Sequence, residues 1–154
     1  MTARKHRLVR TAVVAAGPAE VWELIGGFAG LGDWHPHLPP STAEGEGDPA
    51  LPGAVRVFAI DGKVVARERL LARDEDTRAY TYTVLDPMLP IGDYIATLAV
   101  HPHENGRADG TEIVWSAEYS GADEVVPQVE ALFGDGTYGT GLAALREKFG
   151  RAQV

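Results

Sequence analysis

The chain has 154 residues, of which 45% are hydrophobic and 23% charged, and we expect residues 1–154 to form one globular domain. The formal net charge of -8 leaves no basic footprint for a nucleic acid, and no apolar run is long enough for a membrane span. Cysteine is absent, which excludes disulfides, thiol nucleophiles and zinc–thiolate sites. The basic N-terminus runs into a helix signal rather than a signal peptide, so we expect a cytoplasmic protein.

The N-terminal third predicts one strand followed by two short helical segments. Residues 8–14 are rich in β-branched side chains and predict the strand. Pro18 suits the first turn of a helix, because its missing N–H costs nothing there, and apolar residues at helical spacing follow it. A second helical turn is predicted at 31–34. Residues 38–52 are rich in Pro, Gly, Glu and Ser and predict a surface loop.

Five strand candidates follow, each separated from the next by a short, turn-like segment. They cover residues 54–60, 63–73, 79–86, 94–101 and 111–119. Because short connections join antiparallel neighbours, we expect these strands to form a meander.

The last segment predicts a helix with two apolar stripes that disagree. At 3.6 residues per turn one stripe holds Tyr138, Leu142, Leu145 and Phe149, and a nearly opposite one holds Val126, Val129 and Phe133. One straight helix cannot bury both stripes against one sheet. Gly134 and Gly136 lie between them, where helix propensity is lowest. We therefore predict a bend or local break between Phe133 and Tyr138.

Alternation along the strands predicts an inner surface rich in aromatic side chains. It carries Tyr80, Tyr82, Tyr94, Trp115 and Tyr119. Buried tyrosine hydroxyls need partners, which a pocket with ligand or water supplies. In the strand 63–73 the inner set is Val64, Ala66, Glu68 and Leu70, and the outer, wet set is Arg67, Arg69 and Arg73.

The orientation of Arg56 depends on the turn that joins the first two strands of the meander. A two-residue turn at 61–62 would place Arg56 on the face opposite Glu68. A three-residue turn at 60–62, with glycine at the left-handed bulge position, would place Arg56 and Phe58 on the inner face. We favour the three-residue turn, because an inward Glu68 is costly alone and an inward Arg56 would pair with it.

Several motifs, in order, resemble a known family. They are Pro18-Ala19-Glu20-Val21-Trp22, Trp34-His35-Pro36, Arg67-Glu68-Arg69-Leu70, Tyr80-Thr81-Tyr82, Leu89-Pro90 with Tyr94, Gly110-Thr111 with Trp115, and Gly141-Leu142. With the element order, the chain resembles the START/Bet v 1-like (SRPBCC) superfamily, and within it the polyketide cyclase/dehydrase and lipid-transport group. The resemblance implies an α+β helix-grip fold: a curved antiparallel sheet of about six strands around a C-terminal helix.

The resemblance also implies a cavity between sheet and helix that takes a hydrophobic ligand. The loop at 87–93 is similar to an entrance loop of plant hormone receptors, and topology places it at the same sheet end as the 61–63 turn and the 120–124 connection. Our candidate ligand contacts are Trp34, Phe58, Glu68, Tyr80, Tyr82, Leu89, Tyr94, Trp115, Tyr119, Phe133 and Tyr138.

Three functions fit these features. The first is binding of a small hydrophobic or aromatic ligand, lipid- or polyketide-like, for transport, sensing or sequestration. The second is a cyclase, dehydratase or isomerase, in which Glu68 moves a proton and Arg56 or Tyr82 stabilises an enolate oxygen. The third is a partner-binding regulator with a filled interior. For Glu68 we favour a structural ion pair with Arg56 over a catalytic role.

Two histidine motifs are the candidates for metal binding. They are His35-Pro36-His37 and His101-Pro102-His103. Because the proline limits convergence of the two rings in each motif, we expect no metal and no cofactor, and we expect Trp34 and His35 to anchor the helical segment. The expected partner is a small hydrophobic molecule, and the sequence sets no oligomeric state.

Overall fold

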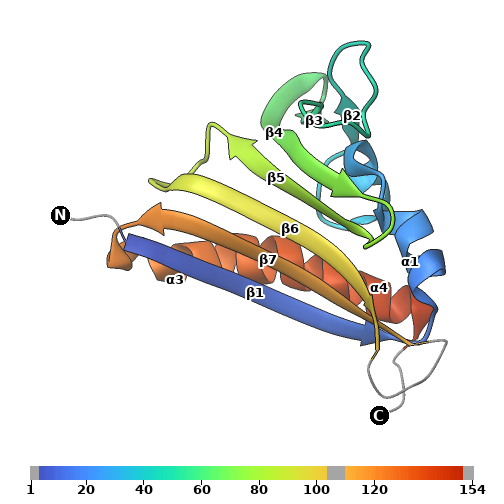
Figure 1. Cartoon of the computed structure of the whole chain (residues 1–154). Coiled ribbons are helices and arrows are strands. Elements are labelled where there is room, and N and C mark those ends of the chain that lie inside the picture. The colour runs from blue at the N-terminus through green and yellow to red at the C-terminus, as the bar shows by residue number, and fades with distance from the viewer. Residues whose placement is uncertain (1–3, 104–109, 151–154) are drawn as a thin grey trace.

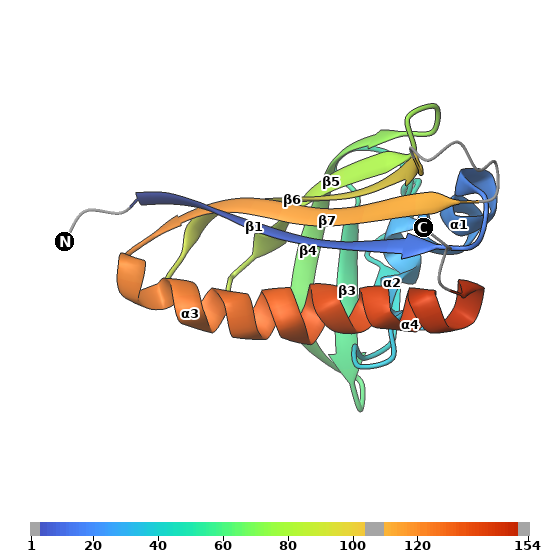
Figure 2. The same cartoon turned by 90° about the horizontal axis from the view of Figure 1, so that it is seen from below.

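The computed structural model describes residues 4–103 and 110–150. Seven strands form one antiparallel sheet in the order β1-β7-β6-β5-β4-β3-β2, and a long C-terminal helix packs against its inner face (Figures 1 and 2). The strands are β1 (Arg4–Val14), β2 (Ser41–Ala43), β3 (Val55–Ile60), β4 (Lys63–Asp74), β5 (Ala79–Leu85), β6 (Gly92–Pro102) and β7 (Thr111–Gly121). The predicted helix-grip fold is confirmed, with one strand more than the sequence indicated.

The additional strand, β2, lies in the segment predicted as a loop. Ser41 pairs with Phe58 of β3. The Ser41 hydroxyl accepts a hydrogen bond from the Gly32 N–H at 2.7 Å and donates one to the Ala29 carbonyl at 2.8 Å. These bonds hold a strand of three residues, which is too short to show an alternating pattern. The helical elements between β1 and β2 are α1 (Pro18–Ile25), η1 (Phe28–Gly30) and α2 (Leu31–Trp34).

The predicted three-residue turn between β3 and β4 is wrong, although Arg56 does face inward, as that turn was expected to make it. Ile60 pairs with Lys63, so the turn has two residues, Asp61 and Gly62, both with positive φ (51° and 78°), as tight hairpin turns prefer. The extra residue lies further along, because β4 carries a bulge at Val65. That bulge, rather than the turn, shifts the register and brings Arg56 opposite Glu68.

A second bulge in β4 overturns the predicted face of Arg73. Leu70 pairs with Tyr82 but Ala72 pairs with Thr81, which leaves Leu71 as the extra residue. Beyond it the side chains change face. Arg73 therefore turns inward, where its Nε donates to the Gly26 carbonyl at 2.9 Å.

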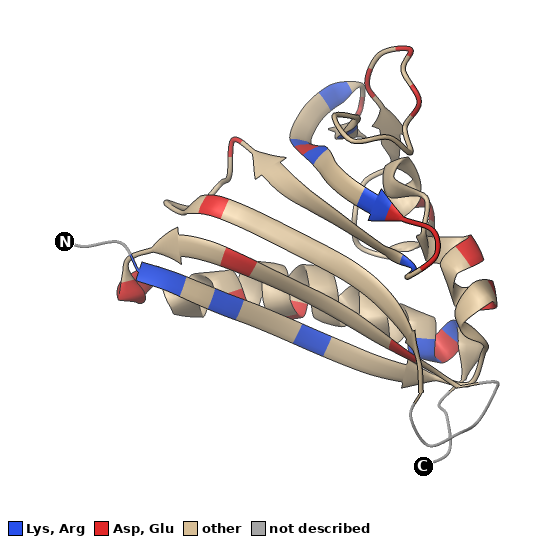
Figure 3. Ribbon diagram, viewed as in Figure 1, with Lys and Arg blue, Asp and Glu red and all other residues tan. Residues whose placement is uncertain are grey.

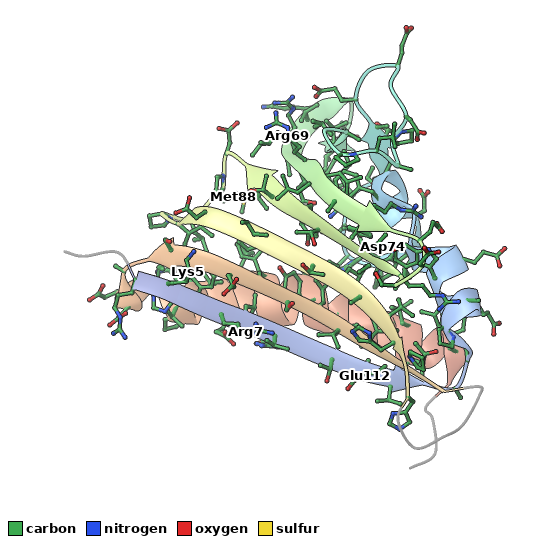
Figure 4. The ribbon with its side chains drawn as sticks, viewed as in Figure 1. Lys5, Arg7, Arg69, Asp74, Met88 and Glu112 are labelled. Atoms are coloured by element: carbon green, nitrogen blue, oxygen red, sulfur yellow. The ribbon has the colours of Figure 1, made fainter. Side chains whose placement is uncertain are left out.

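Two of the three arginines predicted on the outer face of β4, Arg67 and Arg69, do lie there. Arg69 is exposed at the outer surface, where Figure 4 labels it. Arg67 forms an exposed ion pair with Glu44. Val64, predicted to face inward, is exposed because the bulge at Val65 intervenes.

The C-terminal helix runs without a break, so the predicted bend or break is wrong (Figure 2). It consists of η2 (Asp123–Val125), α3 (Val126–Val129), η3 (Glu130–Gly139) and α4 (Thr140–Phe149). The ten residues of η3 form a π-helix, in which each turn is wider than in an α-helix. Within the described residues, no helix is both long and apolar enough to cross a membrane.

The π-helix explains the two disagreeing apolar stripes. Each residue turns about 100° in an α-helix and roughly 20° less in a π-helix. Over the ten residues of η3 the difference reaches about half a turn, which carries both stripes to the sheet. Val129, before the π segment, and Leu142, after it, are accordingly both buried.

Side chains five residues apart line up along η3, as the wider turn requires. The Thr140 hydroxyl donates to the carbonyl of Asp135 at 3.0 Å. From β1, Arg10 Nη2 contacts Glu130 at 2.9 Å and Asp135 at 3.1 Å. Figure 3 shows the other basic residues of β1 along the same edge of the sheet. Arg10 thus ties β1 to two successive π turns.

Candidate functional site

A cavity of about 250 Å³ lies between the β3–β5 part of the sheet and the π-helix. Its walls are mainly apolar and aromatic. Three of its apolar lining side chains, Val65, Met88 and Leu132, are also exposed, Met88 by 75%, so the cavity opens to solvent beside them. Figure 4 shows Met88 at the loop that follows β5. This loop is the one that the resemblance implied as an entrance.

The structure brings six of the eleven predicted ligand contacts together in this cavity. They are Phe58, Glu68, Tyr82, Tyr94, Phe133 and Tyr138. The other five, which do not line it, are Trp34, Tyr80, Leu89, Trp115 and Tyr119. Lining residues that the sequence reasoning missed are Leu31, Leu38, Pro39, Val65, Ala66, Val84, Leu85, Asp86, Met88, Leu132 and Thr137. Two signals were available for them: alternation had placed Ala66 and Val84 on the inner face, and the resemblance had implied an entrance loop at 87–93, which contains Met88.

Helix phase decides which inner aromatic side chains reach the cavity. Tyr138 stacks on Trp115, with ring centroids 4.6 Å apart and planes 9° from parallel. Tyr138 therefore lines the cavity and covers Trp115. Tyr80 instead lies against Phe28, and its hydroxyl contacts Arg56.

The predicted pairing of Arg56 with Glu68 is confirmed. Arg56 Nε donates to Glu68 Oε1 at 2.7 Å, and Nη2 lies 2.6 Å from the same oxygen as an ion pair without hydrogen-bond alignment. Nη1 donates to the Phe28 carbonyl at 2.8 Å and to the Tyr80 hydroxyl at 3.1 Å. The rings of Phe28 and Tyr82 flank the guanidinium at 4.2 and 4.5 Å.

Arg56 is fully buried and does not line the cavity. Burial works against its charge, but the nearby Glu68 carboxylate raises the net pKa of Arg56 above its ordinary value. Glu68 is the member of the pair that reaches the cavity wall. The pair therefore presents a carboxylate, and not a guanidinium, to any molecule inside.

Three tyrosine hydroxyls form a cluster at the cavity wall. The hydroxyls of Tyr94 and Tyr138 are hydrogen-bonded to each other, and Trp115 Nε1 donates to the Tyr82 hydroxyl at 3.0 Å. Burial raises the pKa of Tyr94, while the hydrogen bond with Tyr138 acts in the opposite direction. Burial also raises the pKa of Tyr82 and of Tyr138 well above the usual range. All three remain protonated phenols at neutral pH.

Both ring nitrogens of His35 are hydrogen-bonded to the backbone and are therefore not free to bind a ligand. Its Nε2 lies 2.6 Å from the Thr137 carbonyl, and its Nδ1 accepts the His37 N–H at 3.1 Å. Both contacts fit a neutral ring with its proton on Nε2, and burial lowers the pKa of His35. Within residues 4–103 and 110–150 no three His, Asp or Glu side chains gather as a metal site requires.

A curved sheet that holds a long helix over a mainly apolar cavity defines a helix-grip domain of the ligand-cavity kind. The chain belongs to the family described as polyketide cyclase / dehydrase and lipid transport, whose sequence profile matches residues 5–150. The resemblance stated from the sequence is therefore confirmed.

Solved structures with this fold come from bacteria and a plant. A protein of Thermobifida fusca is 38% identical, with a TM-score of 0.85, and the match covers 94% of this chain and 93% of that one. The protein XoxI of Bacillus cereus is 29% identical with a TM-score of 0.78, over 93% and 94% of the two chains. Norcoclaurine synthase of Thalictrum flavum is 20% identical with a TM-score of 0.72, over 97% and 96%, which shows a shared fold. No curated protein matches the chain.

Proposed function

We propose that the protein binds a small hydrophobic or aromatic molecule in the cavity, for transport, sensing or sequestration. The observation that carries the proposal is the cavity itself, which is mainly apolar and opens beside Met88. Ligand sites are typically concave and apolar, with a few placed polar groups, as Glu68 and the tyrosine hydroxyls are here. A partner-binding regulator with a filled interior would have no such cavity.

Two experiments test ligand binding. Native mass spectrometry of protein purified from its own host is expected to reveal a co-purified small molecule. In the second, Val84→Phe places a ring in the cavity and is expected to abolish binding of that molecule. Val114→Phe, on the opposite face of the sheet, is the matched control and is expected to bind normally. Equal binding by both variants would place the ligand outside the cavity and overturn the proposal.

One observation supports an enzyme as the second candidate. Both Arg56 contacts go to Oε1 of Glu68, and within the described residues no side chain engages Oε2. Such an oxygen can accept a substrate proton, while a phenol such as Tyr82 donates to an enolate oxygen. The reaction would be cyclisation, dehydration or isomerisation of a polyketide-like carbonyl substrate.

Glu68→Gln separates the two candidates. For a binding protein, affinity is expected to remain largely intact, because an amide keeps the shape and one acceptor oxygen. For an enzyme, turnover is expected to collapse while the substrate still binds. Affinity and turnover are measured on the same preparation, after circular dichroism has shown that the variant is folded.

A further inference from the structure

We infer that the cavity selects uncharged ligands, such as ketones, and that it rejects carboxylates. This inference rests on the proposed binding function and names the ligand chemistry of the same site. Two features of the cavity carry it: its polar side chains are carboxylates and hydroxyls, and the nearest cation is already engaged by other groups.

The tyrosine hydroxyls of the cavity wall are uncharged. The Tyr82 hydroxyl accepts a hydrogen bond from Trp115 Nε1, and the hydroxyls of Tyr94 and Tyr138 are hydrogen-bonded to each other. Each hydroxyl has one hydrogen and two acceptor lone pairs, so the cluster can serve a neutral polar group of a ligand, such as a ketone oxygen, and it supplies no positive charge for an anion.

The charge of the cavity is negative. Glu68 lines its wall and Asp86 also lines it, whereas no Lys or Arg of the described residues does. Arg56, the nearest cation, is buried and engaged by Glu68, the Phe28 carbonyl and Tyr80. A ligand carboxylate would thus lose its hydration and face a like charge without a counter-ion.

The volume sets the size of suitable test molecules. At about 30 Å³ per water molecule, a cavity of 250 Å³ corresponds to about eight waters. This volume suits a molecule with a single ring or two fused rings. Naphthalene, acetonaphthone and naphthoate share one ring frame and differ in a single substituent. The ketone supplies an uncharged acceptor, and naphthoate supplies an anion of similar size.

The test is calorimetric or NMR titration of the full chain with these three compounds at neutral pH. Acetonaphthone is expected to bind at least about tenfold more tightly than naphthoate. Glu68→Gln removes the charge and keeps the shape, so it is expected to leave acetonaphthone binding largely intact and to strengthen naphthoate binding about three- to tenfold. Glu118→Gln is the matched control, because this exposed carboxylate does not line the cavity.

The outcomes separate the two proposals. If naphthalene binds but naphthoate equals or exceeds acetonaphthone, the charge selection is overturned while ligand binding stands. If Glu68→Gln leaves the naphthoate affinity unchanged, the role of Glu68 in this selection is overturned. If none of the three compounds binds, ligand binding in this cavity itself fails. Should Glu68→Gln not fold, the ratio of ketone to carboxylate affinity in the unaltered protein still decides the charge selection.

Discussion

At the residue scale, the buried ion pair dominates the candidate site. Arg56 is fully buried, whereas the Glu68 side chain keeps 14% of its exposure. Loss of either partner leaves the other charge unpaired, and the penalty is larger for the more deeply buried one. Replacing Glu68 and replacing Arg56 should therefore destabilise the protein by different amounts, although each change removes the same interaction.

We predict that Glu68→Leu lowers the free energy of unfolding by about 3–5 kcal/mol, because it strands Arg56 in the core. Arg56→Met is expected to cost less, since Glu68 can still reach solvent or the cavity. The double variant should recover most of the loss, as an apolar pair of similar volume often replaces a buried ion pair. Urea denaturation measures all three. Arg67→Met, in the exposed pair with Glu44, is the control and should have little effect.

His35 gives the protein a predicted loss of stability in mild acid. Burial holds the pKa of His35 below its ordinary value near 6.5. As pH falls below about 6.5 the unfolded chain takes up this proton first, so the contribution is full above that pH and declines toward the lower folded-state pKa. Denaturation midpoints between about pH 7 and pH 5 should fall less steeply in His35→Gln. An unchanged slope would assign the acid sensitivity to other groups.

At the element scale, the π-helix joins the two halves of the closing helix. Gly134 matters because of close approach: a Cβ there would lie 2.5 Å from Arg10 Nη2 and 3.0 Å from Leu8 Cδ1. Gly136 is exposed, and a Cβ there would lie 3.3 Å from the Ala131 carbonyl oxygen, within the helix itself. The two glycines of one element thus have different reasons to be there.

We predict that Gly134→Ala lowers the free energy of unfolding by about 1–3 kcal/mol, because it forces Arg10 and Leu8 away from the helix. Gly136→Ala should be neutral or stabilising by up to about 1 kcal/mol, since alanine is the better helix former. Thermal and urea unfolding compare them. A larger loss in the Gly136 variant would contradict this account of how β1 packs on η3.

The sequence predicted these elements better than it predicted their irregularities. The disagreeing stripes predicted an irregularity between Phe133 and Tyr138, which lies within the π segment Glu130–Gly139, but propensity alone could not distinguish a break from a wider turn. The bulges at Val65 and Leu71 consist of ordinary β-forming residues, so nothing in their side chains marks them. Arg56 was placed correctly because a lone inward carboxylate needs a partner, an argument that does not depend on the turn.

At the scale of the whole molecule, the cavity is built from distant parts of the chain. Which inner side chains line it depends on the phase of the closing helix, and strand alternation carries no information about that phase. Sequence reasoning therefore found the correct face, but only six of its eleven predicted contacts line the cavity. Trp115 shows the difference, because it faces inward as predicted yet lies beneath Tyr138.

Because the cavity wall includes both the loop after β5 and the π-helix, we predict that a ligand stabilises these two segments together. At a ligand concentration of about 100 Kd the whole fold should gain about 2.7 kcal/mol. With acetonaphthone bound, amide hydrogen exchange should slow most near Met88 and in η3, and little in α1, which does not line the cavity. Val84→Phe should show neither the slowing nor a rise in melting temperature. Protection confined to α1 would instead indicate a binding site at the other end of the molecule.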